Sequence, residues 1–401
     1  MRRAPLLAVL LAALLLSGCA DTSVPSTSSS GASVETEIQT QGLPLAPVPL
    51  PKRVERTDVP ENNDADFSLS KVNLPAHAID PMIYGSVTPL IWYTDDSGKW
   101  GACDWDGTVL LDCRYDDAAF FCEDGVAAVQ QGGLWGYVNL RGEDLLPCTH
   151  PSVAALHDEI LLASDDSGAF TVYDLDGNAL GSLPANIDSD NVYGGLIPFC
   201  DEASGLYGYL NADGSVAIPA TYSAVYPFGN GLAAAQDAAT GKKGFLDVSG
   251  QWAIPPRYDV VFHGYSGGYA TVGTASEDAT SPTGLCGLID AVGNPASDAD
   301  YLDITPFADG WAAYERDGSR GYLNKNNVEH DLSSLLGNSD TPSTFSGGYA
   351  VYTTPEGLCG YLDSDLNIAV PAQFSSCSKV VSGKALVQRT DGTICVLTLK
   401  N

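Results

Sequence analysis

An eight-residue phrase recurs along most of this chain. It reads Trp-Gly-Tyr-Val-Asn-Leu-Arg-Gly at 135–142, returns at 207–214 and 243–250, and appears in shortened form at 359–363. The glycine in its second position recurs on average about every 37 residues. These glycines are Gly101, Gly136, Gly208, Gly244, Gly287, Gly321 and Gly360. Because one such unit cannot bury its apolar face alone, the repeat predicts units that pack side by side.

Each unit is expected to consist of short strands joined by tight turns. At 207–214 an alternating strand runs into Asn-Ala-Asp-Gly, where Gly supplies a left-handed conformation and Asp bonds its own backbone. A third strand at 217–222 contains Pro219, and proline is tolerated only at the edge or end of a sheet. The chain has 42 Gly and 24 Pro and shows no amphipathic helix after residue 20, which predicts an all-β fold.

The two ends of the repeat region complement each other. Residues 81–90 align with 219–228, the second half of a unit, while the chain closes on a first half at 383–397. Two such halves would complete one blade of a closed ring, so we expect a β-propeller-like architecture. Degenerate copies at Thr171 and Thr393 bring the count to nine registers, more than the four to eight blades of typical propellers. A curved β-solenoid is the alternative.

These phrases resemble the bacterial WG repeat, whose usual form is aromatic-Gly-Tyr-Ile-Asp, then Ile-Pro-x-x-Tyr, then Phe-x-x-Gly. The resemblance covers about residues 79–401. The leading Trp stands only at Trp100 and Trp135 and is replaced elsewhere by Tyr, Lys, Cys or Arg. A position that accepts all of these predicts packing and not a platform for stacking a ligand.

The N-terminus has the pattern of an export signal. Arg2 and Arg3 precede an apolar run that ends in Leu16-Ser17-Gly18-Cys19, too short to span a membrane. The last four residues resemble the lipobox of bacterial lipoproteins, which implies a diacylglyceryl thioether on Cys19 and cleavage before it. Two acyl chains give stable anchoring in a lipid bilayer. An ordinary signal with an incidental cysteine is the alternative.

Three regions follow from these patterns. Residues 1–18 form the signal peptide, residues 19–75 the lipidated Cys19 with a disordered Ser/Thr/Pro-rich tether, and residues 76–401 the WG-repeat β domain. Composition rich in Ser, Thr, Pro and charge buries too little apolar surface to fold, which favours a tether at 20–66. An irregular cap packed on the domain is the alternative.

The net charge of the chain limits the classes of partner that it can bind. It has 50 Asp and Glu against 19 Lys and Arg, a net charge of −31. Nucleic acids and anionic lipid surfaces are bound through basic patches, so both are excluded as partners of the folded part. A solvated, self-repelling surface explains the acidity.

Export makes disulfides possible for the nine cysteines beyond Cys19. We expect most of them to be small buried apolar residues. One pair is singled out: Cys103 and Cys395 occupy the same register in the first and last units, so closure of the ring would make them neighbours. A disulfide between them is therefore a prediction, although equivalent sites on adjacent blades can be too far apart for the bond.

No motif in the sequence indicates catalysis, a cofactor or a metal. Residues 104–107 and 174–177 begin like calcium loops but lack the further acids and distal Glu, so we interpret them as turns. The five histidines lack ligand spacing, and there is no Gly-x-Ser-x-Gly elbow, P-loop or His-Glu-x-x-His. The sequence predicts no catalytic residues.

The hypothesis that fits these patterns is a non-catalytic binding or scaffold module. It would be lipid-anchored to a bacterial membrane on its extracytoplasmic side and would recognise an envelope protein or a glycan. A structural or sensory subunit of an envelope assembly is the alternative, and a propeller-type hydrolase is a third.

Overall fold

The computed structural model describes residues 50–56, 67–82, 90–119, 125–154, 160–184, 186–188, 195–273, 284–336 and 342–399. The chain divides into two compact units, Met1–Ala46 and Pro47–Asn401, and every described residue belongs to the second. All regular elements among the described residues are strands. In this part of the chain no helix is long and apolar enough to cross a membrane.

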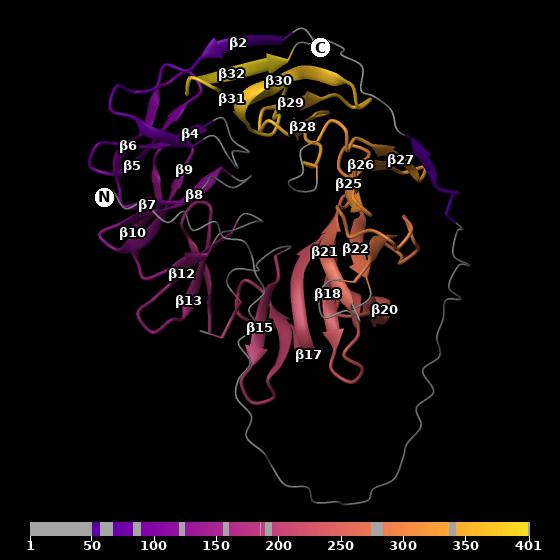
Figure 1. Cartoon of the computed structure of the whole chain (residues 1–401). Helices are drawn as coiled ribbons and strands as arrows, with labels where there is room; N and C mark the ends of the chain where they lie inside the picture. The colour runs from indigo at the N-terminus through magenta and orange to yellow at the C-terminus, as the bar shows by residue number, and fades with distance from the viewer. Residues whose placement is uncertain are drawn as a thin grey trace, which may run out of the picture. The chain divides into compact units, whose positions relative to one another are not determined.

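The described strands form seven sheets that surround a central axis (Figure 1). The first sheet contains β3 (Ile79–Met82), β4 (Leu90–Thr94), β5 (Trp100–Asp104) and β6 (Val109–Tyr115). The second contains β7 (Asp117–Ala118), β8 (Val126–Gln131), β9 (Leu134–Asn139) and β10 (Asp144–His150). The third contains β11 (Val153–Ala154), β12 (Ile160–Ser164), β13 (Phe170–Asp174) and β14 (Ala179–Leu183).

The fourth sheet has six strands: β15 (Ile197–Asp201), β16 (Leu206–Leu210), β17 (Val216–Gly229), β18 (Leu232–Asp237), β19 (Lys243–Asp247) and β20 (Trp252–Tyr258). The fifth contains β21 (Val260–Ser266), β22 (Tyr269–Gly273) and β23 (Cys286–Asp290). The sixth contains β24 (Asp303–Ile304), β25 (Trp311–Arg316), β26 (Ser319–Asn324), β27 (Val328–Asp331) and β1 (Val54–Arg56). The seventh contains β28 (Ala350–Thr353), β29 (Cys359–Leu362), β30 (Ile368–Cys377), β31 (Lys384–Arg389), β32 (Ile394–Leu399) and β2 (Phe67–Lys71).

This arrangement is a β-propeller, with seven blades when each sheet of the described part is counted once. Two of the blades are double, because β17 and β30 each continue from the outer strand of one repeat unit into the inner strand of the next. Each of the nine expected registers has its own central hairpin. The hairpins are β4–β5, β8–β9, β12–β13, β15–β16, β18–β19, β22–β23, β25–β26, β28–β29 and β31–β32. Nine repeat units therefore fit into seven sheets, because the fourth and seventh sheets each contain two units.

The ring is closed by the N-terminal part of the domain. Strand β2 pairs antiparallel with β32 over five residue pairs, from Phe67 opposite Leu399 to Lys71 opposite Cys395, and the two strands lie side by side in Figure 1. Beyond β2, the buried Val72 packs in one apolar cluster with residues of the first and last units. The predicted closed ring is confirmed and the solenoid alternative is wrong. The predicted closing segment at 81–90 is also wrong, because the strand that pairs with β32 is β2, whereas β3 belongs to the first sheet.

The boundary predicted at residue 76 is wrong, because β1 and β2 belong to sheets of the β domain. The region 67–72 has no register glycine and contains Ser68 and Ser70, so its sequence resembles that of the tether. Pairing with β32 supplies the apolar cover that its own composition lacks. The N-terminal segment up to residue 49 lies outside the described residues.

The register glycine is required by a close approach of backbones. The third strand of most units has a register shift where it passes this glycine, as between β19 and β20. A Cβ placed on Gly244 would lie 2.5 Å from the carbonyl oxygen of Ile254 and 2.8 Å from the nitrogen of Pro256. Gly208 and Gly360 meet the same obstruction at equivalent backbone atoms. Only a residue without a side chain fits here.

The aromatic residue after this glycine ties one unit to the next. Tyr209 is fully buried, and its hydroxyl donates to the carbonyl of Tyr226 at 2.6 Å, where the chain crosses into the following unit. The hydroxyls of Tyr322 and Tyr361 donate in the same way to carbonyls 21 and 17 residues further on. A buried Tyr needs such a partner, so the hydrogen bond fixes the crossing as well as satisfying the side chain.

The turn before each third strand uses its first residue as a hydrogen-bond acceptor. In each turn except the one that begins at Asn211, the Oδ1 of this first residue accepts backbone N–H groups from the second and fourth residues after it. The positions are Asp104, Asn139, Asp174, Asn211, Asp247, Asp290, Asn324 and Asp363. Side-chain hydrogen bonds from Asn178 and Ser249 hold the pKa values of Asp174 and Asp247 below their usual range. Many acidic residues of this chain are thus committed to its turns.

Candidate functional site at the outer edge of β27

Residues 50–56, which we call the strap, run along the outside of the sixth sheet (Figure 1). Within the strap, β1 pairs with β27 in parallel, whereas every other pairing between described strands is antiparallel. The N–H of Val54 donates to the carbonyl of Asn327 at 3.1 Å, and the amide Nδ2 of Asn327 donates to the carbonyl of Pro51 at 2.9 Å. A segment far away in sequence therefore completes this sheet.

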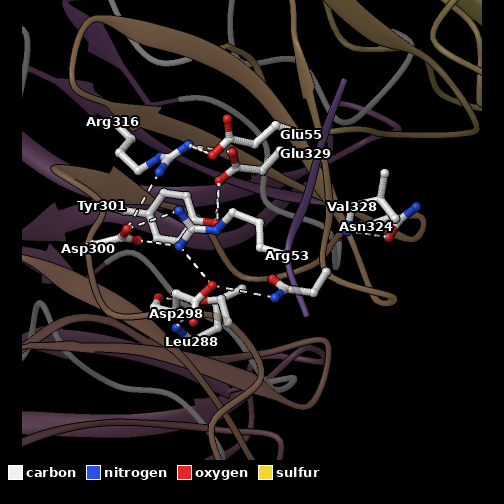
Figure 2. Close-up of polar contacts among 12 residues, drawn as sticks. Arg53, Glu55, Leu288, Asp298, Asp300, Tyr301, Arg316, Asn324, Val328 and Glu329 are labelled. Atoms are coloured by element: carbon white, nitrogen blue, oxygen red, sulfur yellow. Dashed lines mark hydrogen bonds and ion pairs between the residues drawn. The ribbon is translucent and has the colours of Figure 1, made fainter. Parts of the chain in front are cut away.

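A single guanidinium joins the strap to two neighbouring sheets. Arg53 makes a bidentate pair with Asp300, at 2.6 and 2.9 Å, and contacts Asp298 at 2.8 Å. Both aspartates lie in the irregular segment that follows β23. The Arg53 Nε lies 3.6 Å from an oxygen of Glu329 on β27, as Figure 2 shows. The Arg53 side chain is only 13% exposed, so it anchors the strap in the junction between the fifth and sixth sheets.

Glu329 is the buried member of this group of charges. Its side chain is 2% exposed, and it accepts hydrogen bonds from the Tyr301 hydroxyl at 2.6 Å and from Arg316 at 2.7 Å (Figure 2). Arg316 also contacts Glu55 of the strap at 2.9 Å and Asp300 at 3.5 Å. A carboxylate this buried needs paired charges and hydrogen bonds, and here it has both. We call Arg53, Glu55, Asp298, Asp300, Tyr301, Arg316 and Glu329 the ionic cluster.

The electrostatics keep the pair formed by Arg53 and Asp300 charged near neutral pH. Burial acts to raise the pKa of Asp300, but the hydrogen bond from Arg53 and the charges of Arg53 and Arg316 outweigh it, so that pKa lies below its usual range. Burial alone would lower the pKa of Arg53, but the bond to Asp300 and the nearby negative charges raise it. Burial and the bond to Glu329 raise the pKa of the Tyr301 hydroxyl, which remains a donor. The strap is therefore held by charge-assisted bonds.

A cavity of about 270 Å³ lies beside the strap. Leu50 and Pro51 form one wall, and Tyr269 and Phe307 form another, with their rings edge to face at 4.8 Å. The Lys325 ammonium lies 5.3 Å from the centre of the Tyr269 ring. Asp290, Asn294, Pro295 and Ala296 complete the lining. The Oδ1 of Asp290 already accepts two N–H groups within its own turn. Of the two charged residues that line the cavity, Lys325 is therefore the better placed to bind a ligand.

The sequence missed the strap as a structural element. Two signals could have found it. Lys52, Arg53 and Arg56 place three cations within five residues of a chain that has 19 in total. The segment 328–331 also lacks the proline that third strands carry at Pro147, Pro219 and Pro255.

Cysteines were the main candidates from the sequence. Cys103 and Cys395 are both buried free thiols, so the structure does not contain the predicted disulfide between them. Cys103 packs with Ile394 and Val396, which flank Cys395. Cys395 itself points to the opposite face of β32, into the cluster that contains Val387. Side chains alternate along a strand, so equivalent register in adjacent units did not bring the two sulfurs together. Burial raises the pKa of Cys103 to about 12.

A disulfide joins a different pair, Cys359 and Cys377, whose Cα atoms are 6.2 Å apart. It connects β29 with the end of β30 and encloses a sequence separation of 18 residues. Cys113, Cys148, Cys200 and Cys286 are free thiols, and all are buried or half-buried. Cys19 and Cys122 lie outside the described residues.

Replacing Cys359 and Cys377 together by alanine is expected to lower the free energy of unfolding by about 3 kcal/mol, since the cross-link restricts a loop of this size in the unfolded chain. Urea denaturation under non-reducing conditions measures the difference. The matched control is Cys148→Ala, which removes a half-buried free thiol. An unchanged urea midpoint for the double variant, together with a full count of free thiols in the wild type, would show that the bond does not form.

The other predicted features are found where packing or turns explain them. Trp100 and Trp135 are half-buried against apolar clusters, so the expectation that they pack is confirmed. Residues 104–107 and 174–177 are turns, with the first Asp of each bonded to backbone N–H groups. Among the described residues, no three His, Cys, Asp or Glu side chains are grouped as a metal site. His157 lies outside the described residues.

The fold and the repeat define the class of this protein, a β-propeller built from short repeated units. The family model of the WG containing repeat matches residues 100–135, 207–237 and 244–273. The chain therefore contains WG repeats, as the sequence pattern predicted. No curated protein matches the chain.

Solved structures resemble the fold at low sequence identity. A crystal structure of a eukaryotic initiation factor matches 82% of this chain and 92% of its own, at 12% identity and a TM-score of 0.52. The computationally designed Ika8 protein matches 82% and 98%, at 14% identity and a TM-score of 0.42. BamB from Moraxella catarrhalis matches 83% and 98%, at 14% identity and a TM-score of 0.38. At 12% identity the likeness to the initiation factor concerns the fold alone.

Proposed function

We propose that this chain is a lipid-anchored, extracytoplasmic binding module that presents its propeller to an envelope protein or glycan. One partner is the lipid bilayer, which the protein contacts through the acylated Cys19. The proposed module uses no cofactor and no catalytic group. The fold by itself does not fix a function. The proposal combines the lipobox-like sequence with the way in which the N-terminal segment joins the ring.

The observation that carries the proposal is that the segment following Cys19 is built into the propeller at two places. The strap is held through Arg53, and β2 completes the last sheet. An anchor at Cys19 would therefore be attached to the ring through residues 20–49. A scaffold that displays a surface near a membrane needs such an attachment.

The use of the acidic side chains supports binding over catalysis. Carboxylates in the turns accept backbone N–H groups, and those of the ionic cluster pair with arginines. The strand-end turns that remain exposed differ in sequence from unit to unit on a regular frame. Variation of this kind on a repeated face suits recognition of a partner.

Substitution of the lipidation site tests the anchoring. In bacteria that express the full chain, the wild type is expected in the membrane fraction and the Cys19→Ser variant in the soluble extracytoplasmic fraction. The matched control is Cys200→Ser, which changes a half-buried thiol of the propeller and should leave the protein in the membrane fraction. Recovery of wild type and Cys19→Ser in the same soluble fraction would contradict the proposal.

Capture experiments test the binding role. The anchored protein, solubilised in detergent, is used to retain proteins from an envelope extract and is applied in parallel to a glycan array. Retention of one envelope protein or one glycan class supports the proposal. Retention of neither would contradict it and would favour a structural role without a specific ligand.

A further inference from the structure

The outer edge of β27 is paired with the strap and with no other described segment. Exposed edges attract other strands, and proteins protect them with prolines and bulges. Strands β10, β20 and β30 carry Pro147, Pro255 and Pro371 and have register shifts against their neighbours. Strand β27 has no proline, and its pairing with β26 is regular from Gly321 to Leu323. Its backbone can therefore accept an added strand, as it does with β1 at Val328, Glu329 and His330.

The acidic side of this edge is held in place without the strap. Glu329 is fixed by Tyr301 and Arg316, and Asp300 lies 3.5 Å from Arg316. None of these residues belongs to the strap. Asp298 and Asp300 are each more than 40% exposed even with the strap in position. A site for a guanidinium is thus preformed on the ring.

The strap itself is a short and weakly buried occupant. All three residues of β1 are exposed, and Val54 is 47% exposed although it is apolar. Its attachment consists of the Arg53 guanidinium, a contact from Glu55 to Arg316, the bond from the Asn327 amide to the carbonyl of Pro51 and a few bonds between backbone groups. Closure of the ring depends on β2 and not on β1. The strap can therefore leave without opening the propeller.

We propose that the β27 edge, with Asp298, Asp300 and Glu329, is an exchangeable docking site for an extended peptide, and that the strap is its resident occupant. The partner is a segment of another protein that presents an arginine followed two residues later by an acidic residue, as Arg53 and Glu55 do. It adds a parallel strand to β27, a mode in which backbone bonds give affinity and side-chain sites give specificity. The inference names a site for the proposed binding module and rests on that proposal.

The strap competes with any such partner because it is tethered to the site. A tethered occupant acts at an effective concentration on the order of millimolar, so a free peptide binds the intact chain poorly. Variants confined to the strap release this competition and leave the ring unchanged. Arg53→Ala removes the guanidinium, and Val54→Pro removes the N–H that donates to Asn327.

The experiment uses the full chain from residue 19 with Cys19→Ser, and a fluorescent peptide of residues 48–58 as the probe. Fluorescence anisotropy is expected to show at least about tenfold tighter binding to the Arg53→Ala and Val54→Pro chains than to the parent chain. In the Arg53→Ala background, the added pair Asp298→Asn and Asp300→Asn should reverse the gain. These two aspartates are partly exposed, so their substitution leaves the ring folded, which circular dichroism and thermal unfolding verify. A probe with alanine at the Arg53 position should bind none of the chains.

Several results would overturn the inference. One is a pair of strap variants, both folded, that bind the probe no better than the parent chain. Another is binding that persists after both aspartates are replaced. A third is dimerisation of the strap variants with no binding of the probe, which would assign the edge to a second copy. If the aspartate variant retains envelope proteins as well as the parent chain does, the protein is a binding module but the β27 edge is not its contact. If the wild type is not anchored in the membrane but the strap variants bind the peptide, the docking site holds and the proposed lipid anchoring is wrong.

Discussion

A chain that begins at residue 76 is expected to lose its cooperative fold, whereas a chain that begins at residue 47 keeps it. The shorter chain lacks β2 and Val72, which is only 3% exposed, and it uncovers Leu397 and Leu399 of β32. Each buried aliphatic side chain contributes about 1.5–3 kcal/mol, so two or three of them amount to about 5 kcal/mol. That figure equals the lower end of the net stability of a whole domain.

Urea denaturation followed by circular dichroism, together with size-exclusion chromatography, measures this effect. The matched control begins at residue 57, so that it lacks the strap but retains β2 and Val72, and it should unfold close to the chain that begins at residue 47. If the chain from residue 76 unfolds at the same urea concentration as the chain from residue 47, β2 does not close the ring.

The second large effect is expected at the repeat glycine. Substitution Gly244→Ala should lower the free energy of unfolding by about 3 kcal/mol, the upper part of the range for overpacked cores. The new Cβ would lie 2.5 Å from the Ile254 carbonyl oxygen, and this atom belongs to backbone that no rotamer change can move aside. The third strand of the unit must shift, and with it the bulge that the strand carries.

Gly264→Ala is the matched control, because Gly264 lies in β21 of the next sheet and has no atom within 4 Å of its ideal Cβ position. We expect this variant to unfold within about 0.5 kcal/mol of wild type, as is usual for surface substitutions. Urea denaturation measures both free energies of unfolding. Equal losses of stability for Gly244→Ala and Gly264→Ala would show that the close approach of the Ile254 carbonyl does not explain the glycine, and that the entropy of the unfolded chain does.

The elements inside each unit were predictable because their causes are local. The turn at 211–214 and the strand at 208–211 follow from residues that act on their own backbone, and both are present. That the ring closes was also predictable from the complementary halves at its two ends, but the closing segment was not: β2, and not residues 81–90, pairs with β32. The nine registers fit a propeller because β17 and β30 each serve two units, which a repeat count alone cannot reveal.

The candidate site was harder to predict because its parts come together only through long-range contacts. Arg53 and Asp300 are separated by 247 residues, and nothing near Arg53 indicates a strand except its local charge. The pairing of Cys103 with Cys395 failed for a related reason. Register equivalence places two residues in adjacent units, but the face of the strand decides where each sulfur points.

The sequence by itself determined the repeat, the all-β class and the role of glycine, aromatic residue and turn in each unit. These depend on interactions within about 20 residues, which the order of residues encodes directly. Only the tertiary structure decided that residues 50–72 belong to the propeller, which cysteines pair, and how Arg53, Arg316 and Glu329 form one ionic cluster. Such contacts depend on which edges and faces meet once the ring has closed.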